Sequence, residues 1–100
     1  MSQLSRSVLL KIDSGIRYEV QILAENGIET TESCQGGKGH AFPEPTIVFN
    51  GARDEGFKAL AIALAHDLKV YALRRTWRVL EGEPVGPEWQ MTFRPPRSSR

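Results

Sequence analysis

The stretch VYALRRTWRVLEGEPVGPEWQMTF, residues 70–93, decides the fold. Residues 70–80 are rich in β-branched and aromatic side chains, which favour strands. Residues 88–93 alternate strictly between polar and large apolar side chains: Glu88, Gln90 and Thr92 against Trp89, Met91 and Phe93. The segment EGEPVGP between them, residues 81–87, has the glycine and proline content of a turn. We therefore expect a β-hairpin with one buried face.

A first helix is predicted upstream by an apolar stripe with a spacing of three or four residues. The stripe consists of Ile12, Ile16, Val20 and Leu23. Asp13 or Ser14 is expected to cap its start, and Asn26-Gly27 is expected to end it.

A second helix is predicted by the strongest stripe in the chain, which we expect to face the core. Its members are Phe57, Leu60, Ala61, Leu64, Ala65 and Leu68. Asn50 and Asp54 are the candidate caps of this helix.

Two short strands fill the chain between these helices. Ile28–Cys34 is rich in β-branched residues, and the segment TIVFN, residues 46–50, makes a second strand. The loop of residues 35–45 between them is rich in glycine and proline. The order α-β-β-α-β-β predicts a single α+β domain, residues 1–94, with a four-stranded antiparallel or mixed sheet and two helices on one face. An open second face would offer a surface for a partner or for dimerisation. Residues 95–100 are expected to be a disordered basic tail.

Composition sets the class of protein. One hundred residues suffice for a single core, and a formal charge of +1 gives no global attraction to nucleic acid. No apolar run approaches the ~20 residues that cross a bilayer, and the N-terminal segment lacks the ~7–15-residue apolar region of a signal peptide. We expect a cytoplasmic protein without a disulfide, because Cys34 is the only cysteine.

The segment ESCQGGKGH, residues 32–40, is the first candidate site. Backbone amides in glycine-rich turns bind anions, and three glycines surround a cationic side chain here. The predicted ligand-binding residues are Ser33, Cys34, Gly36, Gly37, Lys38, Gly39, His40 and Glu44. The segment matches neither the phosphate-loop nor the dinucleotide-binding glycine pattern. The alternative interpretation is that the glycines only let a long strand connection turn sharply.

The same segment raises an enzymatic alternative. Cys34 could act as a nucleophile with His40 as its base, while Glu32 or Glu44 orients the imidazole. The competing interpretation is a small buried thiol, because free cysteine is among the most buried residue types. A metal site would have to use Cys34, His40, Glu44 and His66, but one cysteine cannot supply the paired spacings of structural zinc. We therefore expect no metal and no cofactor.

The first strand of the hairpin is the second candidate site. It carries three arginines close to a tryptophan: Arg74, Arg75 and Arg78 beside Trp77. Arginines bind the phosphate backbone of nucleic acids, and an exposed aromatic ring stacks on bases. Alternation, however, places Trp77 with Leu73 and Val79 on a face that looks like core. The alternative is a solvated basic strand face.

In addition, the chain from about Gly27 to Phe93 resembles a group of small uncharacterised bacterial and phage-encoded proteins. The resemblance rests on ESCQGGKGH, EPTIVFNG, LRRTWRV, GEPVGP and WQMTF, in that order. The resemblance implies a single domain from a prokaryotic or phage source. It does not imply any particular activity. A local resemblance to the S-C-S-G-R segment of wybutosine-synthesising methyltransferases covers Ser33, Cys34 and Gly36, whereas Gln35 and Gly37 depart from that pattern.

Three functions follow from these features. The first hypothesis is a non-enzymatic binding protein whose glycine loop holds an anionic or phosphate-bearing ligand. The second is an interaction or inhibitor protein that docks on a host protein through its sheet face or hairpin, and the third is a Cys-His enzyme. A homodimer is compatible with each, and nucleic acid is a less favoured partner.

Overall fold

The protein alternates helices with pairs of strands, as its computed structural model describes for residues 12 and 15–94. The elements are α2 (Arg17–Glu25), β1 (Thr30–Cys34), β2 (Thr46–Phe49), α3 (Arg53–Ala65), β3 (Val70–Leu80) and β4 (Glu83–Phe93). This α+β order confirms the prediction. Neither described helix has the length and apolar character needed to cross a bilayer. The predicted caps Asp13 and Ser14 and the predicted tail, residues 95–100, lie outside the described residues.

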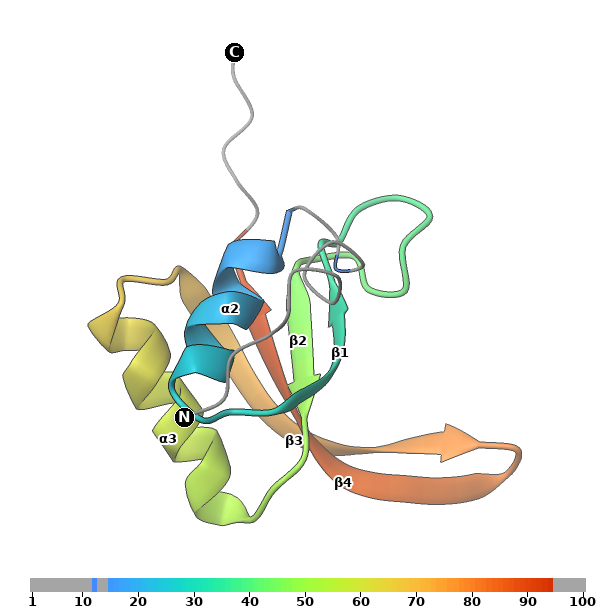
Figure 1. The fold of residues 1–100 in the computed structure, drawn as a ribbon. Helices are drawn as coiled ribbons and strands as arrows, with labels where there is room; N and C mark the ends of the chain where they lie inside the picture. The colour runs from blue at the N-terminus through green and yellow to red at the C-terminus, as the bar shows by residue number, and fades with distance from the viewer. Residues whose placement is uncertain (1–11, 13–14, 95–100) are drawn as a thin grey trace.

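The strands form one antiparallel sheet in the order β1-β2-β4-β3, and both helices lie on one of its faces (Figure 1). The central strands β2 and β4 are in register from the pair Thr46–Thr92 to the pair Phe49–Trp89. β2 ends at Phe49, whereas the β3–β4 hairpin continues for several residues beyond Trp89. The hairpin is therefore longer than the sheet that supports it.

The core lies between the sheet and the two helices. Its buried members are Ile16, Val20, Leu23, Ile28, Ile47, Phe49, Ala59, Ala63, Leu68, Trp89, Met91 and Phe93. The three apolar residues of β4 thus point inward, as expected. Their polar neighbours Glu88, Gln90 and Thr92 are also buried, so the expectation of a single buried face on β4 is wrong. β4 is a central strand, and the Arg78 side chain lies against Glu88 on the face away from the helices.

The buried side of α3 differs from the predicted stripe. Gly56, Ala59 and Ala63 face the core, whereas Phe57 and Leu64 are largely exposed. The reason is close packing: a Cβ built on Gly56 would lie 2.4 Å from the indole ring of Trp89. Small residues on this side let the helix approach the sheet, and large residues there would hold it away.

Backbone geometry sets the ends of both helices. The N-cap residues are Ile16 in α2 and Ala52 in α3, and neither makes a side-chain capping bond, so the predicted capping of α3 by Asn50 or Asp54 is wrong. Asp54 instead lies in the first turn of α3, where a carboxylate complements the helix dipole. The predicted end of α2 at Asn26-Gly27 is confirmed, with Gly27 at φ 92°.

Candidate functional site

The glycine loop joins β1 to β2 and starts at the end of a buried strand. Cys34 pairs with Thr46 across the two strands, and the loop extends beyond this pair (Figure 1). Gly36 has φ 81°, and a Cβ there would lie 2.4 Å from the carbonyl carbon of Glu44. No other residue fits at position 36, because both the backbone conformation and the space require glycine.

Two of the three glycine amides that we expected to bind an anion donate hydrogen bonds within the loop. The Gly36 amide donates to Cys34 Sγ at 3.4 Å, and the Gly37 amide donates to the carbonyl of Pro43 at 3.0 Å. The carbonyl of Gly37 in turn accepts from the amide of His40 at 3.1 Å. Gly37, Lys38, Gly39 and His40 are exposed, so the loop presents one lysine on a tightly turned backbone.

The thiol and the carboxylates around the loop have structural neighbours. Cys34 is 4% exposed and its Sγ lies 4.0 Å from the carbonyl oxygen of Phe42, which agrees with a small buried thiol at a strand end. The Tyr71 hydroxyl of β3 donates to Glu44 Oε1, and this hydrogen bond raises the pKa of Tyr71 above its ordinary value. Ser33 is half-buried in β1 opposite Ile47. Within residues 12 and 15–94, no three His, Cys, Asp or Glu side chains come together as metal ligands.

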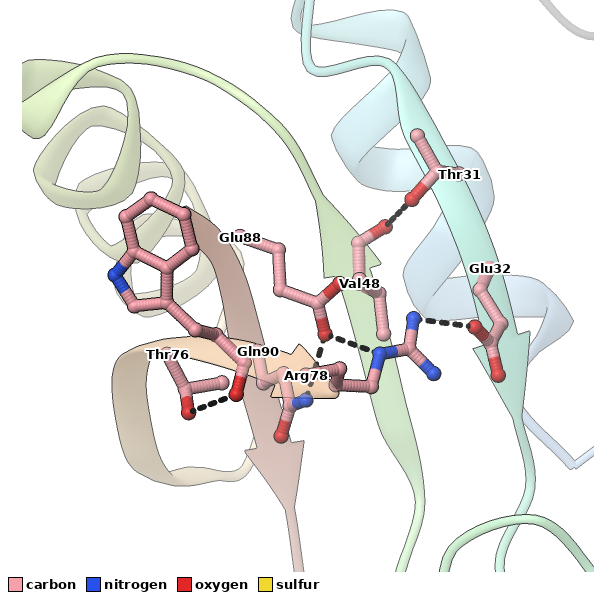
Figure 2. Close-up of polar contacts among 8 residues, drawn as sticks. Thr31, Glu32, Val48, Thr76, Arg78, Glu88 and Gln90 are labelled. Carbon is pink, nitrogen blue, oxygen red and sulfur yellow. Dashed lines mark hydrogen bonds and ion pairs between the residues drawn. The ribbon is translucent and has the colours of Figure 1, made fainter. Parts of the chain in front are cut away.

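Arg78 connects the hairpin to the opposite edge of the sheet. Its Nη2 lies 2.8 Å from Glu32 Oε1 on β1, and its Nε lies 2.8 Å from Glu88 Oε2 on β4. Figure 2 shows the guanidinium between the two carboxylates, with Gln90 Nε2 donating to the same Glu88 oxygen at 2.8 Å. Hydrogen bonds to Glu32 and then to Glu88 raise the pKa of Arg78 further above its already high value. Glu32, one of the two carboxylates that the sequence analysis considered as a partner for the imidazole of His40, is therefore paired with Arg78.

This contact requires the hairpin to bend across the sheet. β1 and β3 are the two outer strands, so three strand spacings, about 14 Å, would separate them in a flat sheet. The hydrogen-bonded contact between Arg78 and Glu32 forms because the hairpin bends toward β1, on the face of the sheet away from the helices, before the rest of the arm projects beyond the sheet (Figure 1). The register shift between Thr76 and Arg78 lies at the required place, since a β-bulge bends and twists a strand.

The three arginines of β3 have different surroundings. Arg78 is held in ion pairs, and Arg75 lies over the ring of Trp89 with 5.4 Å between its Cζ and the ring centroid. Arg74 is exposed and lies opposite Gln90, on the face away from the helices. Arg74 and Arg75 are thus both exposed, whereas Arg78 is partly buried in its ion pairs.

The distal part of the hairpin is the feature that the sequence prediction missed. We call residues 77–87 the arm; it begins after the pair Thr76–Glu88. Its exposed apolar side chains are Trp77 at 57%, Val79 at 69%, Leu80 at 55% and Val85 at 46%. The predicted core face with Trp77 and Val79 is therefore wrong, because β2 stops before the arm begins and supplies nothing to cover it. The unequal strand lengths, a TIVFN strand beside a long hairpin, were the signal in the sequence.

The predicted turn is also too long. Residues 83–87 belong to β4, and only Glu81 and Gly82 connect the strands, with φ 51° and 80°. Positive φ at both positions identifies a type I′ turn, which matches the twist of a two-residue hairpin.

Comparison of the chain with protein-family models, with curated proteins and with solved structures finds no match. The function must therefore be inferred from the geometry of the loop and the arm.

Proposed function

We propose that the protein is a non-enzymatic interaction protein that docks on a protein surface through its arm. One observation carries the proposal: the arm has four large apolar side chains that are each about half exposed or more, Trp77 and Val79 on one face and Leu80 and Val85 on the other. Soluble monomers rarely expose large contiguous apolar patches, and such patches mark interaction sites. An exposed tryptophan beside arginine is the combination that dominates the energetics of protein interfaces.

The shape of the arm supports this function. The arm extends away from the sheet (Figure 1), and none of its residues belongs to the buried core. Its position is nevertheless fixed at the base by Arg78, which is paired with Glu32 and Glu88. A held arm loses less conformational entropy on binding than a free loop, so more of the contact energy is available for affinity.

The glycine loop supports an anion site less well. The amides of Gly36 and Gly37 already donate hydrogen bonds, so at most one of the three glycines, Gly39, can offer its amide to an anion beside the exposed Lys38. An anion nest needs several amides that converge on one point. The arm therefore carries the proposal, and the loop serves as its alternative.

Site-specific photo-crosslinking tests the proposal. A photoreactive residue in place of Val79 should give covalent protein adducts in the source cells, whereas the same residue in place of Leu64 should give few. Leu64 is the matched control because it is exposed to 61%, similar to the residues of the arm, but lies on α3. Trp77→Ser should abolish the adducts. Equal labelling at both positions would overturn the proposal, and a melting temperature raised by inorganic phosphate but not in Lys38→Ala would favour the loop instead.

A further inference from the structure

We propose that the protein surface bound by the arm is the arm of a second copy of this chain. The inference rests on the proposed function and names its partner. The two arms lie antiparallel and pack through the face that carries Trp77 and Val79. The basic end of each arm then lies beside the acidic tip of the other. Such a contact is isologous, so one patch serves both protomers and the assembly closes as a dimer.

The order of charges along the hairpin carries this inference. Arg74 and Arg75 lie just before the arm, whereas Glu81 and Glu83 lie at its tip. The exposed apolar side chains lie between these two ends. Arg78, at the base of the arm, is already paired with two carboxylates. Antiparallel packing places the acidic tip of each arm beside Arg74 and Arg75 of the other copy, so opposite charges meet at both ends. Parallel packing would place like charges side by side.

The apolar centre fits the same arrangement. Arg74 and Glu81 are seven residues apart, about 23 Å along a strand, and Trp77 lies near the middle of that span. A two-fold axis at the middle of the span from Arg74 to Glu81 therefore brings the two Trp77 side chains to the centre of the interface. Interface energy concentrates at large aromatic residues in that position.

The turn residue is a second, independent observation. Glu81 has φ 51°, in the left-handed region, where a type I′ turn favours asparagine, aspartate or glycine. A glutamate at this position costs stability in the isolated hairpin, because its Cβ is poorly placed in that region. Its carboxylate gains a partner when it lies beside the arginines of a second arm.

Charge exchange between the two ends of the arm tests the proposal. The wild-type chain should sediment as a concentration-dependent dimer between about 1 and 100 μM, the range of modest interfaces. Glu81→Lys with Glu83→Lys, and separately Arg74→Glu with Arg75→Glu, should each raise the dissociation constant about tenfold or more, because like charges then meet at both ends. Native mass spectrometry of an equimolar mixture of the two variants should show a heterodimer, because the basic ends of one variant then lie beside the acidic ends of the other. Lys38→Glu, a charge reversal on the loop, should leave the dimer unchanged.

Two safeguards keep the outcome decisive. Arg75 contacts Trp89, so Arg74→Glu alone replaces the basic-end variant if circular dichroism shows that the double variant is unfolded. A wild-type chain that stays monomeric at every concentration, or variants whose mixture forms no heterodimer, would overturn self-association. Adducts between position 79 and a different protein would then leave the docking function standing, whereas the loss of all adducts at position 79 would remove both.

Discussion

Both helices end at a residue with a left-handed backbone, Gly27 after α2 and Asp67 after α3. In each case the next amide donates five residues back at 2.9 Å, and the left-handed residue's own amide donates three residues back at 3.1 Å. The two ends thus have the same Schellman hydrogen bonds with different residues. Asp67 has a Cβ in a region that favours glycine, and its carboxylate lies at the negative end of the α3 dipole.

Replacing Asp67 with glycine should therefore stabilise the protein. We expect Asp67→Gly to raise the free energy of unfolding by about 0.5–1 kcal/mol, since relief of the left-handed backbone outweighs the entropy that glycine adds to the unfolded chain. The lost ion pair with Lys69, 3.1 Å long and exposed, contributes little. Thermal unfolding should show a rise of about 2–8 °C in the melting temperature.

The opposite change at the other helix is the matched control. Gly27→Ala should lower the free energy of unfolding by about 1 kcal/mol for conformational reasons alone, because the nearest atom to the added Cβ, Lys58 Nζ, is 3.5 Å away. Asp67→Asn separates backbone from charge, since it removes only the carboxylate. A lower melting temperature for Asp67→Gly would show that the ion pair or the side chain outweighs the backbone term.

Residue types predicted the site only in part. A lone cysteine at a strand end is correctly interpreted as a small buried thiol, because burial follows from residue type and strand position. The internal bonds of the Gly36 and Gly37 amides depend on where Pro43 and Cys34 lie after the loop has folded. That information is absent from the local pattern, so glycine content alone overstates the number of available donors.

At the scale of elements, the order and type of all six were predicted from the sequence. Which face of each element is buried was predicted less well. The alternation of β4 identifies its inward residues directly, since a strand has two faces. A helix such as α3 can turn any of several faces toward the sheet. The face with the largest apolar residues packs against the sheet only where there is space for large side chains. Here the Trp89 ring occupies the space beside Gly56, so the side with small residues faces the sheet.

The bend of the hairpin depends on one side chain, that of Arg78. Arg78→Met removes both ion pairs and leaves the nearly buried Glu88 with Gln90 as its donor. We expect a loss of about 1–3 kcal/mol in the free energy of unfolding, because a buried carboxylate without its counter-charge is costly. Hydrogen exchange should speed up at the amides of residues 76–83, 85 and 86, since the arm no longer has its attachment to β1.

Two further variants separate the ion pairs of Arg78. Glu32→Gln should cost about 0–1 kcal/mol, because this carboxylate is about one-third exposed. Glu88→Gln added to Arg78→Met should recover part of the lost stability, since no buried charge then remains. If the double variant is as unstable as Arg78→Met alone, the loss comes from packing of the arginine stem and not from the uncompensated carboxylate.

At the scale of the whole molecule, the core and the arm are distinct parts of one chain. All the members of the buried core cluster lie outside residues 77–87, and the strand pair that enters the arm is Thr76–Glu88. Cohesion of the domain therefore comes from the helices and the four-stranded part of the sheet. The arm adds exposed apolar surface, which favours association and offers little to the stability of the monomer.

Removal of the arm should accordingly leave a folded domain. In the shortened chain, residues 77–87 are replaced by Asn-Gly, because a type I′ turn of two residues joins directly opposed positions such as Thr76 and Glu88. Glu88→Gln accompanies the deletion, since Arg78 is lost with the arm. We expect a single cooperative thermal transition with near-native circular dichroism, and a monomer at concentrations at which the full chain dimerises. The control is the full chain with Glu88→Gln alone, which should keep the dimer; loss of cooperative unfolding in the shortened chain only would show that the arm is part of the folding unit.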